Sequence, residues 1–382
     1  MAKDLSGAAA RARDQRAVLQ AVADGARTQV EAARLLNLSA RQVRRKLARL
    51  AAGGAAAAGL HGLIGQPSNR GLSAKLRQAV LARCRTRFAD FGPTLASEKL
   101  AEEGLAVSPD TLRRWLAAEG LWKPQRRRAT HRARRPRRDR FGELLQLDAS
   151  LHDWTEGRGE AMTLHAAIDD ATGRILGCFA PAETLEGYFT LFEAWLRRHG
   201  RPLALYTDGR TVFHQPGPKP TPTQFGRACK QLGIELIRAH SPQAKGRVER
   251  LFGTLQDRWV KEFRLANVRT IAEANAALPR LIADHVRRFA RTAASSLDAH
   301  RPLHGLELAA ILCAHEQRTV ANDYVVRIAN RHLQIVSAAF PGLRGGLVTL
   351  ELRRQGELKM RFGERPLTYR EIPAPAPAKK RR

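Results

Sequence analysis

The chain has 382 residues, and its 66 Lys and Arg exceed its 36 Asp and Glu, which gives a formal net charge of +30. No apolar run approaches the roughly 18 to 20 residues of a membrane span, and the N-terminus lacks the apolar core of a signal peptide. The four scattered cysteines argue against a disulfide framework or a zinc knuckle. These features predict a cytoplasmic protein without a membrane partner. Its positive field favours phosphate polyanions, and double-stranded DNA with a nucleoid location is the expectation.

Residues 1–62 are predicted to form a helix-turn-helix domain. Thr28 and Glu31 have the spacing of a capping box, and Ser39 and Gln42 repeat it at the start of a second helix. A short helix, a tight turn and a capped basic helix are typical of a motif whose second helix enters the major groove. An Ala-rich helical hairpin with a solvated basic face is the alternative. The candidate DNA-contact residues here are Arg41, Arg44, Arg45 and Lys46.

Residues 72–122 are predicted to form a second helical domain, in which Ser108-Pro109 begins a helix that carries Arg113 and Arg114. These two arginines are candidate DNA contacts, although the block could equally be a structural bundle. In residues 123–140, ten of 18 residues are Lys or Arg. Such a basic linker suits an extended arm along a DNA backbone, because it cannot pack a core.

From Phe141 onward, short strands alternate with helices. The residues from Phe141 to Leu151 alternate in polarity, which places Asp148 on the polar face of a strand, and a short buried strand ends directly at Asp208. Asp169 and Asp170 are interpreted as turn residues between two further strands. The predicted order is β-β-β-α-β-α-β-α, with elements at Phe141–Leu151, Met162–Ile168, Arg174–Ala180, Leu185–His199, Leu203–Thr207, Thr223–Leu232, Ile234–Ile237 and a long helix from Ser241.

The last helix carries a third acid. Val248, Phe252, Leu255 and Trp259 form a core stripe, and Glu249 lies on its flank. We expect Asp148, Asp208 and Glu249 to converge on divalent metal, since hard cations prefer carboxylate oxygens. Two ions would stabilise the attacking and leaving oxygens of a phosphodiester displacement. The alternative is that each acid is a cap, a turn residue or an ion-pair partner.

Three segments carry a family resemblance: Leu145-Gln-Leu-Asp148, Tyr206-Thr-Asp208 and Ser241-Pro-Gln-Ala-Lys-Gly-Arg-Val-Glu249-Arg. Together they resemble the catalytic core of DDE transposases in the retroviral-integrase superfamily, and the fuller stretches are similar to ISNCY-type insertion-sequence transposases. Two departures are the Gly-Arg that follows Asp208, where many relatives have Asn-Gly, and the 40 residues between the second and third acids.

The resemblance covers roughly residues 13–340 and implies a multidomain chain. It would have N-terminal all-α helix-turn-helix domains and a central α/β RNase H-like integrase core over 141–318 with a helical extension. Residues 319–372 have four short strand patterns that suggest a C-terminal small β-barrel, similar to the C-terminal domains of integrases: Tyr324–Ile328, His332–Val336, Leu347–Leu352 and Leu358–Phe362. A disordered basic tail would follow at 373–382. The implied metal is Mg²⁺ or Mn²⁺, held as two ions by Asp148, Asp208 and Glu249, and Lys245 and Arg247 are candidate phosphate contacts.

The predicted function is therefore that of a DNA transposase. It would bind the terminal inverted repeats of its element, cleave a strand with metal-activated water, and join the new 3′-OH to target DNA. A homo-oligomer in a synaptic complex is implied by the resemblance alone. Two alternatives remain open: a catalytically silent helix-turn-helix regulator, and a nuclease of RNase H type without sequence specificity.

Overall fold

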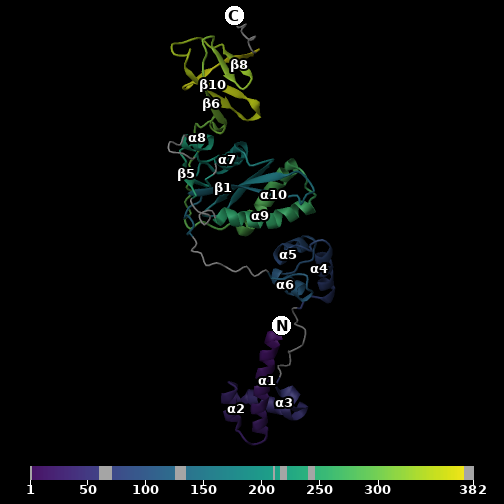
Figure 1. Cartoon of the computed structure of the whole chain (residues 1–382). Coiled ribbons are helices and arrows are strands. Elements are labelled where there is room, and N and C mark those ends of the chain that lie inside the picture. Colours follow the sequence, from purple (N-terminus) through teal and green to yellow (C-terminus); the bar gives the residue numbers. More distant parts are fainter. Residues whose placement is uncertain are drawn as a thin grey trace. The chain divides into compact units, whose positions relative to one another are not determined.

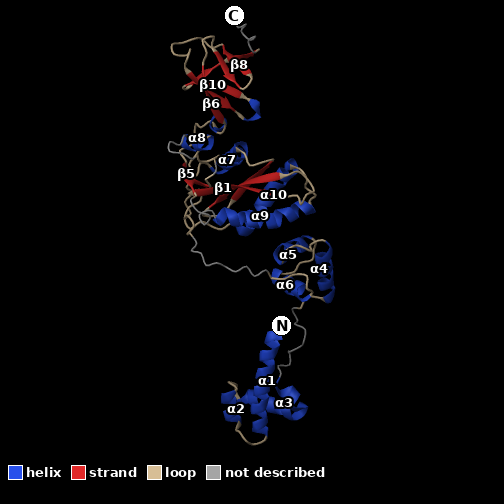
Figure 2. Ribbon diagram, in the orientation of Figure 1, coloured by secondary structure: helices blue, strands red, loops and turns tan. Residues whose placement is uncertain are grey.

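The computed structural model describes residues 2–59, 71–124, 135–209, 211–215, 222–239 and 246–373. The chain divides into two compact units, residues 1–124 and 125–382, which are considered separately below (Figure 1). The first unit is helical throughout, and the second combines sheets with helices (Figure 2). Among the described residues, no helix is both long enough and apolar enough to cross a bilayer.

The first three helices share a small core. They are α1 (Ala2–Ala23), α2 (Gln29–Leu35) and α3 (Ala40–Gly59), and their buried side chains are Leu19, Ala32, Val43 and Leu50. Both predicted capping boxes are present: Thr28 pairs reciprocally with Glu31, and Ser39 with Gln42. Asn37, at the turn between α2 and α3, has a positive φ of 47°, a conformation that Asn tolerates.

A second set of helices follows in the same unit: α4 (Ala74–Thr86), α5 (Pro93–Glu102) and α6 (Pro109–Ala118). The Ser108 hydroxyl accepts a hydrogen bond from the backbone N–H of Thr111, which confirms the predicted start of α6. Buried apolar residues from all three helices, among them Val80, Leu100 and Leu112, indicate a packed bundle.

A five-stranded sheet forms the centre of the second unit, in the order β3-β2-β1-β4-β5. β1 pairs antiparallel with β2 and parallel with β4, and β4 pairs parallel with β5. The predicted strands are confirmed as β1 (Leu144–His152), β2 (Met162–Asp169), β3 (Ile175–Ala180), β4 (Ala204–Thr207) and β5 (Glu235–Arg238).

Helices cover both faces of this sheet (Figure 1). One face packs against α7 (Leu185–His199), and the other packs against α9 (Gly246–Leu265) and α10 (Ile271–Phe289). The predicted stripe of Val248, Phe252, Leu255 and Trp259 is buried, with at most 8% of each residue's surface exposed. Two shorter helices complete the unit, α8 (Gln224–Gln231) and α11 (Leu308–Ile311).

The C-terminal residues form two sheets around a common core, and the predicted small β-barrel is not confirmed. One sheet has the order β11-β10-β9-β6 and the other β12-β8-β7, and no closed barrel is found among the described residues. The four predicted strands are present as β7 (Val325–Ile328), β8 (Arg331–Ile335), β9 (Leu347–Leu352) and β10 (Leu358–Phe362). Three further strands lie outside the predicted set: β6 (Ala314–Thr319), β11 (Arg365–Leu367) and β12 (Tyr369–Ile372).

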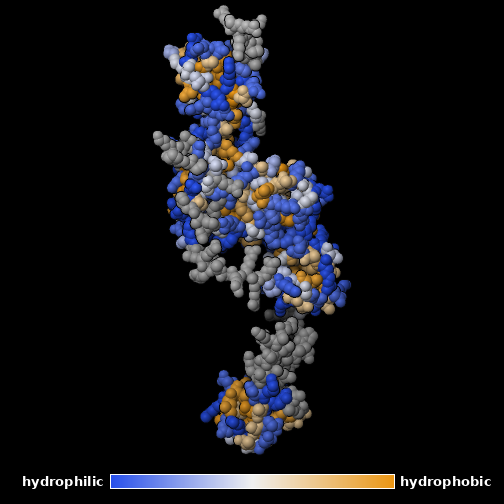
Figure 3. Space-filling view, viewed as in Figure 1, coloured by the Kyte–Doolittle hydropathy of each residue, from blue (hydrophilic) through white to orange (hydrophobic). Residues whose placement is uncertain are grey.

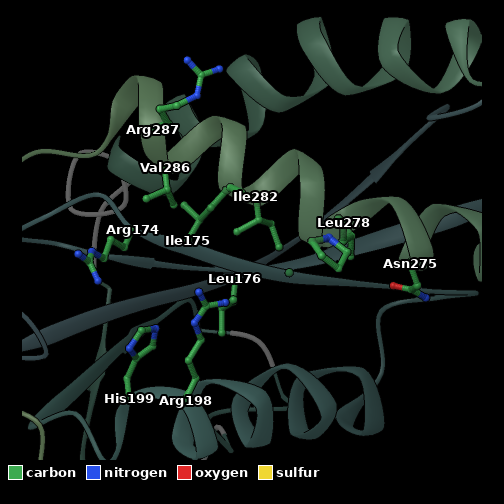
Figure 4. Close-up of a pocket in the computed structure, with 13 residues that line it drawn as sticks. Arg174, Ile175, Leu176, Arg198, His199, Asn275, Leu278, Ile282, Val286 and Arg287 are labelled. Atoms are coloured by element: carbon green, nitrogen blue, oxygen red, sulfur yellow. The ribbon is translucent and has the colours of Figure 1, made fainter.

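A cavity of about 710 Å³ lies at the edge strand β3, between the end of α7 and one side of α10. Its apolar wall includes Leu176 and Ile282, and Arg174, Arg198 and Arg287 lie around it (Figure 4). The Asn275 side-chain amide accepts a hydrogen bond from the Phe179 N–H and donates one to the Phe179 carbonyl. Both backbone groups of Phe179 on the edge strand β3 are therefore hydrogen-bonded. Elsewhere hydrophilic residues dominate the visible surface (Figure 3).

Candidate active site and DNA-contact residues

Asp148 lies in β1, and Asp208 directly follows β4, the strand that pairs parallel with β1. The ladder between β1 and β4 pairs Leu145 with Leu205 and Gln146 with Tyr206. Each acid lies two positions beyond the last residue pair of this ladder, so both aspartates follow the same end of it. Both aspartates are half-buried.

The side chains around Asp148 show which face it occupies. Gln146 and Ser150 flank it at alternate positions of β1, and both contact α9. The Gln146 Oε1 accepts from the Val248 N–H at 3.4 Å, and the Ser150 hydroxyl accepts from Gln256 at 3.0 Å. Because side chains two apart in a strand point the same way, Asp148 faces the side of the sheet that α9 covers.

The charges of both aspartates act on a buried tyrosine. Tyr188, on α7, is fully buried, and its hydroxyl donates a hydrogen bond of 2.9 Å to Glu183. Burial raises the pKa of Tyr188 far above its ordinary value, and the charges of Glu183, Asp148 and Asp208 raise that pKa further. Three carboxylates thus act on one phenol, which therefore stays protonated.

Glu249 lies in the first turn of α9, beside the buried Val248. Its side chain is exposed, and residues 240–245, which lead into the helix, lie outside the described residues. Within the described ranges, no group of three or more His, Cys, Asp or Glu side chains is placed to hold a metal ion. The structure places Asp148 and Asp208 beyond the same end of the β1–β4 ladder, and it places Glu249 on α9, which covers the face of β1 that Asp148 occupies. The meeting of all three acids stays a prediction.

The two acids interpreted as turn residues have different roles. Asp169 holds the β2–β3 turn, because its carboxylate accepts hydrogen bonds from the Thr172 N–H and hydroxyl and from the Gly142 N–H. Burial raises the pKa of Asp169, while those three donors oppose the rise. Asp170, which is also fully buried, instead binds residues from distant segments.

Four groups meet at the Asp170 carboxylate. It is paired with Arg135, accepts from the Arg138 N–H at 2.8 Å and from the Gln146 side chain at 2.9 Å, and lies 3.3 Å from the Arg247 guanidinium. The described end of the basic linker is therefore bound to the core. Arg247, a predicted phosphate contact, has only 10% of its side chain exposed and has this acidic partner.

The remaining DNA-contact candidates lie in the first unit, except Lys245, which falls outside the described residues. Arg41, Arg44 and Arg45 are exposed on α3. Lys46 is half-buried and donates to Gln15 of α1 at 2.9 Å, and burial lowers its pKa. On α6, Arg113 pairs with Asp110, and Arg114 bonds the Thr111 hydroxyl at 3.3 Å.

Comparison with known proteins decides the family. Over 362 residues the chain is 43% identical to the putative transposase y4bF of Sinorhizobium fredii. This match covers 92% of this chain and 79% of that protein. It is 33% identical over 357 residues to the transposase for insertion sequence IS1202 of Streptococcus pneumoniae. That match covers 82% of this chain and 76% of that protein. The chain belongs to the insertion-sequence transposases. Its function is DNA transposition.

Two further comparisons concern parts of this transposase. Residues 15–68 match a family described as a helix-turn-helix domain, which confirms the predicted class of the first three helices. Among solved structures, the catalytic core domain of BIV integrase is 21% identical with a TM-score of 0.30, and covers 42% of this chain and 91% of that one. A chain in the structure of a simian T-cell lymphotropic virus intasome in complex with PP2A regulatory subunit B56 gamma is 14% identical with a TM-score of 0.34, and the match covers 73% of this chain and 96% of that one.

Sequence reasoning missed three residues of this region: Gln146, Asp170 and Tyr188. Gln146 had a detectable signal, because it alternates with Asp148 on the polar face of β1. Asp170 and Tyr188 had none, since their partners lie in other elements of the fold.

Proposed function

We propose that Asp148, Asp208 and Glu249 are the catalytic acids of this transposase, and that they serve both strand cleavage at the element's ends and strand transfer to target DNA. The observation that carries the proposal is the register of β1 and β4. This register supports the proposal, because two acids far apart in sequence follow the same end of one parallel ladder. The helix of the third acid packs on the face that Asp148 occupies.

The chemistry of these side chains fits a divalent cation. Asp148 and Asp208 would supply oxygen ligands of the kind that Mg²⁺ or Mn²⁺ selects, and Glu249 would complete the set. A bound cation polarises a phosphate oxygen and lowers the pKa of bound water, and two such ions are the common arrangement for phosphodiester displacement. Cation binding would also offset the local negative charge, which would otherwise repel DNA phosphates.

The chain's own residues supply the remaining functions. The exposed arginines of α3 would bind the element's terminal repeats, with α3 in the major groove. Gln146 and Ser150 hold α9 against the strand that carries Asp148. Since transposition joins two element ends, we further propose that the active form is a homo-oligomer assembled on DNA.

The direct test is an assay with the full chain, a labelled duplex that carries the element's terminal DNA, and Mg²⁺. Substitution Glu249→Gln removes one carboxylate charge but keeps the side chain's size. Cleavage should fall by roughly 10²–10³-fold, because a preorganised group is removed from the reacting centre. Binding of the duplex should stay unchanged. Asp148→Asn and Asp208→Asn should behave alike.

Asp257→Asn is the matched control, because Asp257 lies on the same helix, is exposed, and pairs with Lys261. This variant should cleave normally. An active Glu249→Gln protein would remove that residue from the catalytic set. A wild-type chain that binds the ends but cuts nothing would favour the silent regulator, and equal cleavage of unrelated duplexes would favour the nuclease.

A further inference from the structure

We propose that Asp170 is a positioning residue of the catalytic centre. Its carboxylate ties the end of the interdomain linker and the start of α9 to the strand that carries Asp148. The four residues bound to it (Arg135, Arg138, Gln146 and Arg247) are called the Asp170 junction here. The inference rests on the proposed function, because it concerns the position of Glu249.

Two residues of the Asp170 junction, Gln146 and Arg247, lie close in sequence to the proposed catalytic acids. Gln146 donates to Asp170 through its amide nitrogen and accepts from the Val248 N–H through its amide oxygen. It lies two residues before Asp148 in β1, and Val248 directly precedes Glu249. Arg247 lies one position earlier in the same helical turn and contacts the Asp170 carboxylate itself. One buried carboxylate therefore orients the segments that bear two of the three catalytic acids.

The same carboxylate holds the linker. Arg135 pairs with it, the Arg138 N–H donates to it, and Arg137 donates to the Asp170 carbonyl at 2.9 Å. The Arg247 guanidinium also donates to the Arg135 carbonyl at 3.2 Å, so linker and helix contact each other directly. The linker follows the DNA-binding helices in the chain. Because the linker is anchored to α9, the segment that follows the DNA-binding helices is bound to the helix that carries Glu249.

Charge explains why an acid is needed at this position. Arg135 and Arg247 approach each other around a fully buried carboxylate, and without it the two cations would repel. Removing one partner of a buried ion pair leaves the other charge uncompensated, which is strongly destabilising locally. We expect the effect to be concentrated in the first turn of α9, since Arg247 and Val248 both depend on the junction.

The test compares Asp170→Asn with Asp169→Asn in the full chain. Both residues are buried in the same turn, but among the described residues the Asp169 carboxylate accepts hydrogen bonds from Thr172 in the turn and from Gly142. Asp170→Asn should lower end cleavage by about 10- to 100-fold, the range found when a group that orients a metal ligand is removed. It should also speed amide hydrogen exchange in residues 246–252, with unchanged duplex binding. Asp169→Asn should lower the melting temperature without selectively faster amide hydrogen exchange in residues 246–252.

A second variant guards against misfolding of Asp170→Asn. Arg247→Met retains an unbranched side chain and removes the charge, so it should reproduce the faster exchange and the lower cleavage. The double variant should be no less active than the worse single one, because both changes break one junction.

Additive effects of the two changes, or exchange in α9 equal to wild type in Asp170→Asn, would overturn the proposal. The exchange measurement needs no DNA cleavage, so a failure of the proposed function would show separately, as a wild-type chain that cuts nothing.

Discussion

The arginines of α3 and those at the start of α9 are the same residue type in opposite settings. Arg41, Arg44 and Arg45 lie on an exposed helix and have no acidic partner among the described residues. Arg247 and Arg135 instead surround the buried Asp170. An exposed cation is available to a phosphate, whereas one paired with a buried acid is held by the fold. On the proposals made above, the setting of each arginine would separate binding from positioning.

The largest expected effect tests the exposed side of this comparison. Changing Arg41, Arg44 and Arg45 together to Ala should weaken binding of the element's ends by roughly 10²–10³-fold, because each arginine that binds a base or a phosphate supplies about 1 kcal/mol or more. The logarithm of the affinity should also depend less steeply on salt, by about one unit for each phosphate that is no longer neutralised. Fluorescence anisotropy over a salt series measures both quantities.

Arg34 of α2 is a suitable control, since it is also exposed but lies on the first helix of the motif. Arg34→Ala should bind with nearly wild-type affinity, and the triple variant should melt at the wild-type temperature. A triple variant that binds normally would transfer the DNA-contact role to another surface.

The fold of the core was largely predictable, and its side-chain network was not. Alternation in β1 and the buried strand that ends at Asp208 depend on local polarity, so short windows of sequence revealed them. The Asp170 junction joins residues up to 112 positions apart, such as Arg135 and Arg247, and no local pattern encodes that interaction. The same reason explains β6, which pairs with the distant β9.

The predicted C-terminal barrel is not confirmed, for a related reason. The strands were recognisable from their polarity, but barrel closure depends on pairing between the first and last strands. In the structure β12 pairs with β8, and β11 with β10, which gives two sheets. Pairing order is a property of the whole domain.

The next expected effect concerns buried histidines, and it should distinguish the core from the N-terminal helices. Burial lowers the pKa of His165 to about 4. Because the unfolded chain binds this proton near pH 6.5, the folded state becomes less stable as the pH falls below that value. Between pH 7 and pH 5 the decrease from His165 should be about 2 kcal/mol. Burial also lowers the pKa values of His199 and His285 to about 4, in the same unit.

Thermal unfolding at several pH values, followed by tryptophan fluorescence of the core, measures this decrease. His165→Gln keeps an acceptor for the Thr184 N–H and should reduce the pH slope. A slope that persists unchanged in His165→Gln would assign the acid sensitivity to other groups.

The smallest expected effect returns to the helices that carry the exposed arginines. Thr28 caps α2, and its hydroxyl accepts from the Glu31 N–H while the Glu31 carboxylate accepts from the Thr28 N–H. Thr28→Ala should cost about 1 kcal/mol of stability, measured by urea unfolding of the N-terminal helices. Since α2 supports α3 through the core of Ala32 and Val43, duplex binding should weaken only as far as the helices unfold. Weaker binding at unchanged stability would mean that Thr28 binds DNA directly.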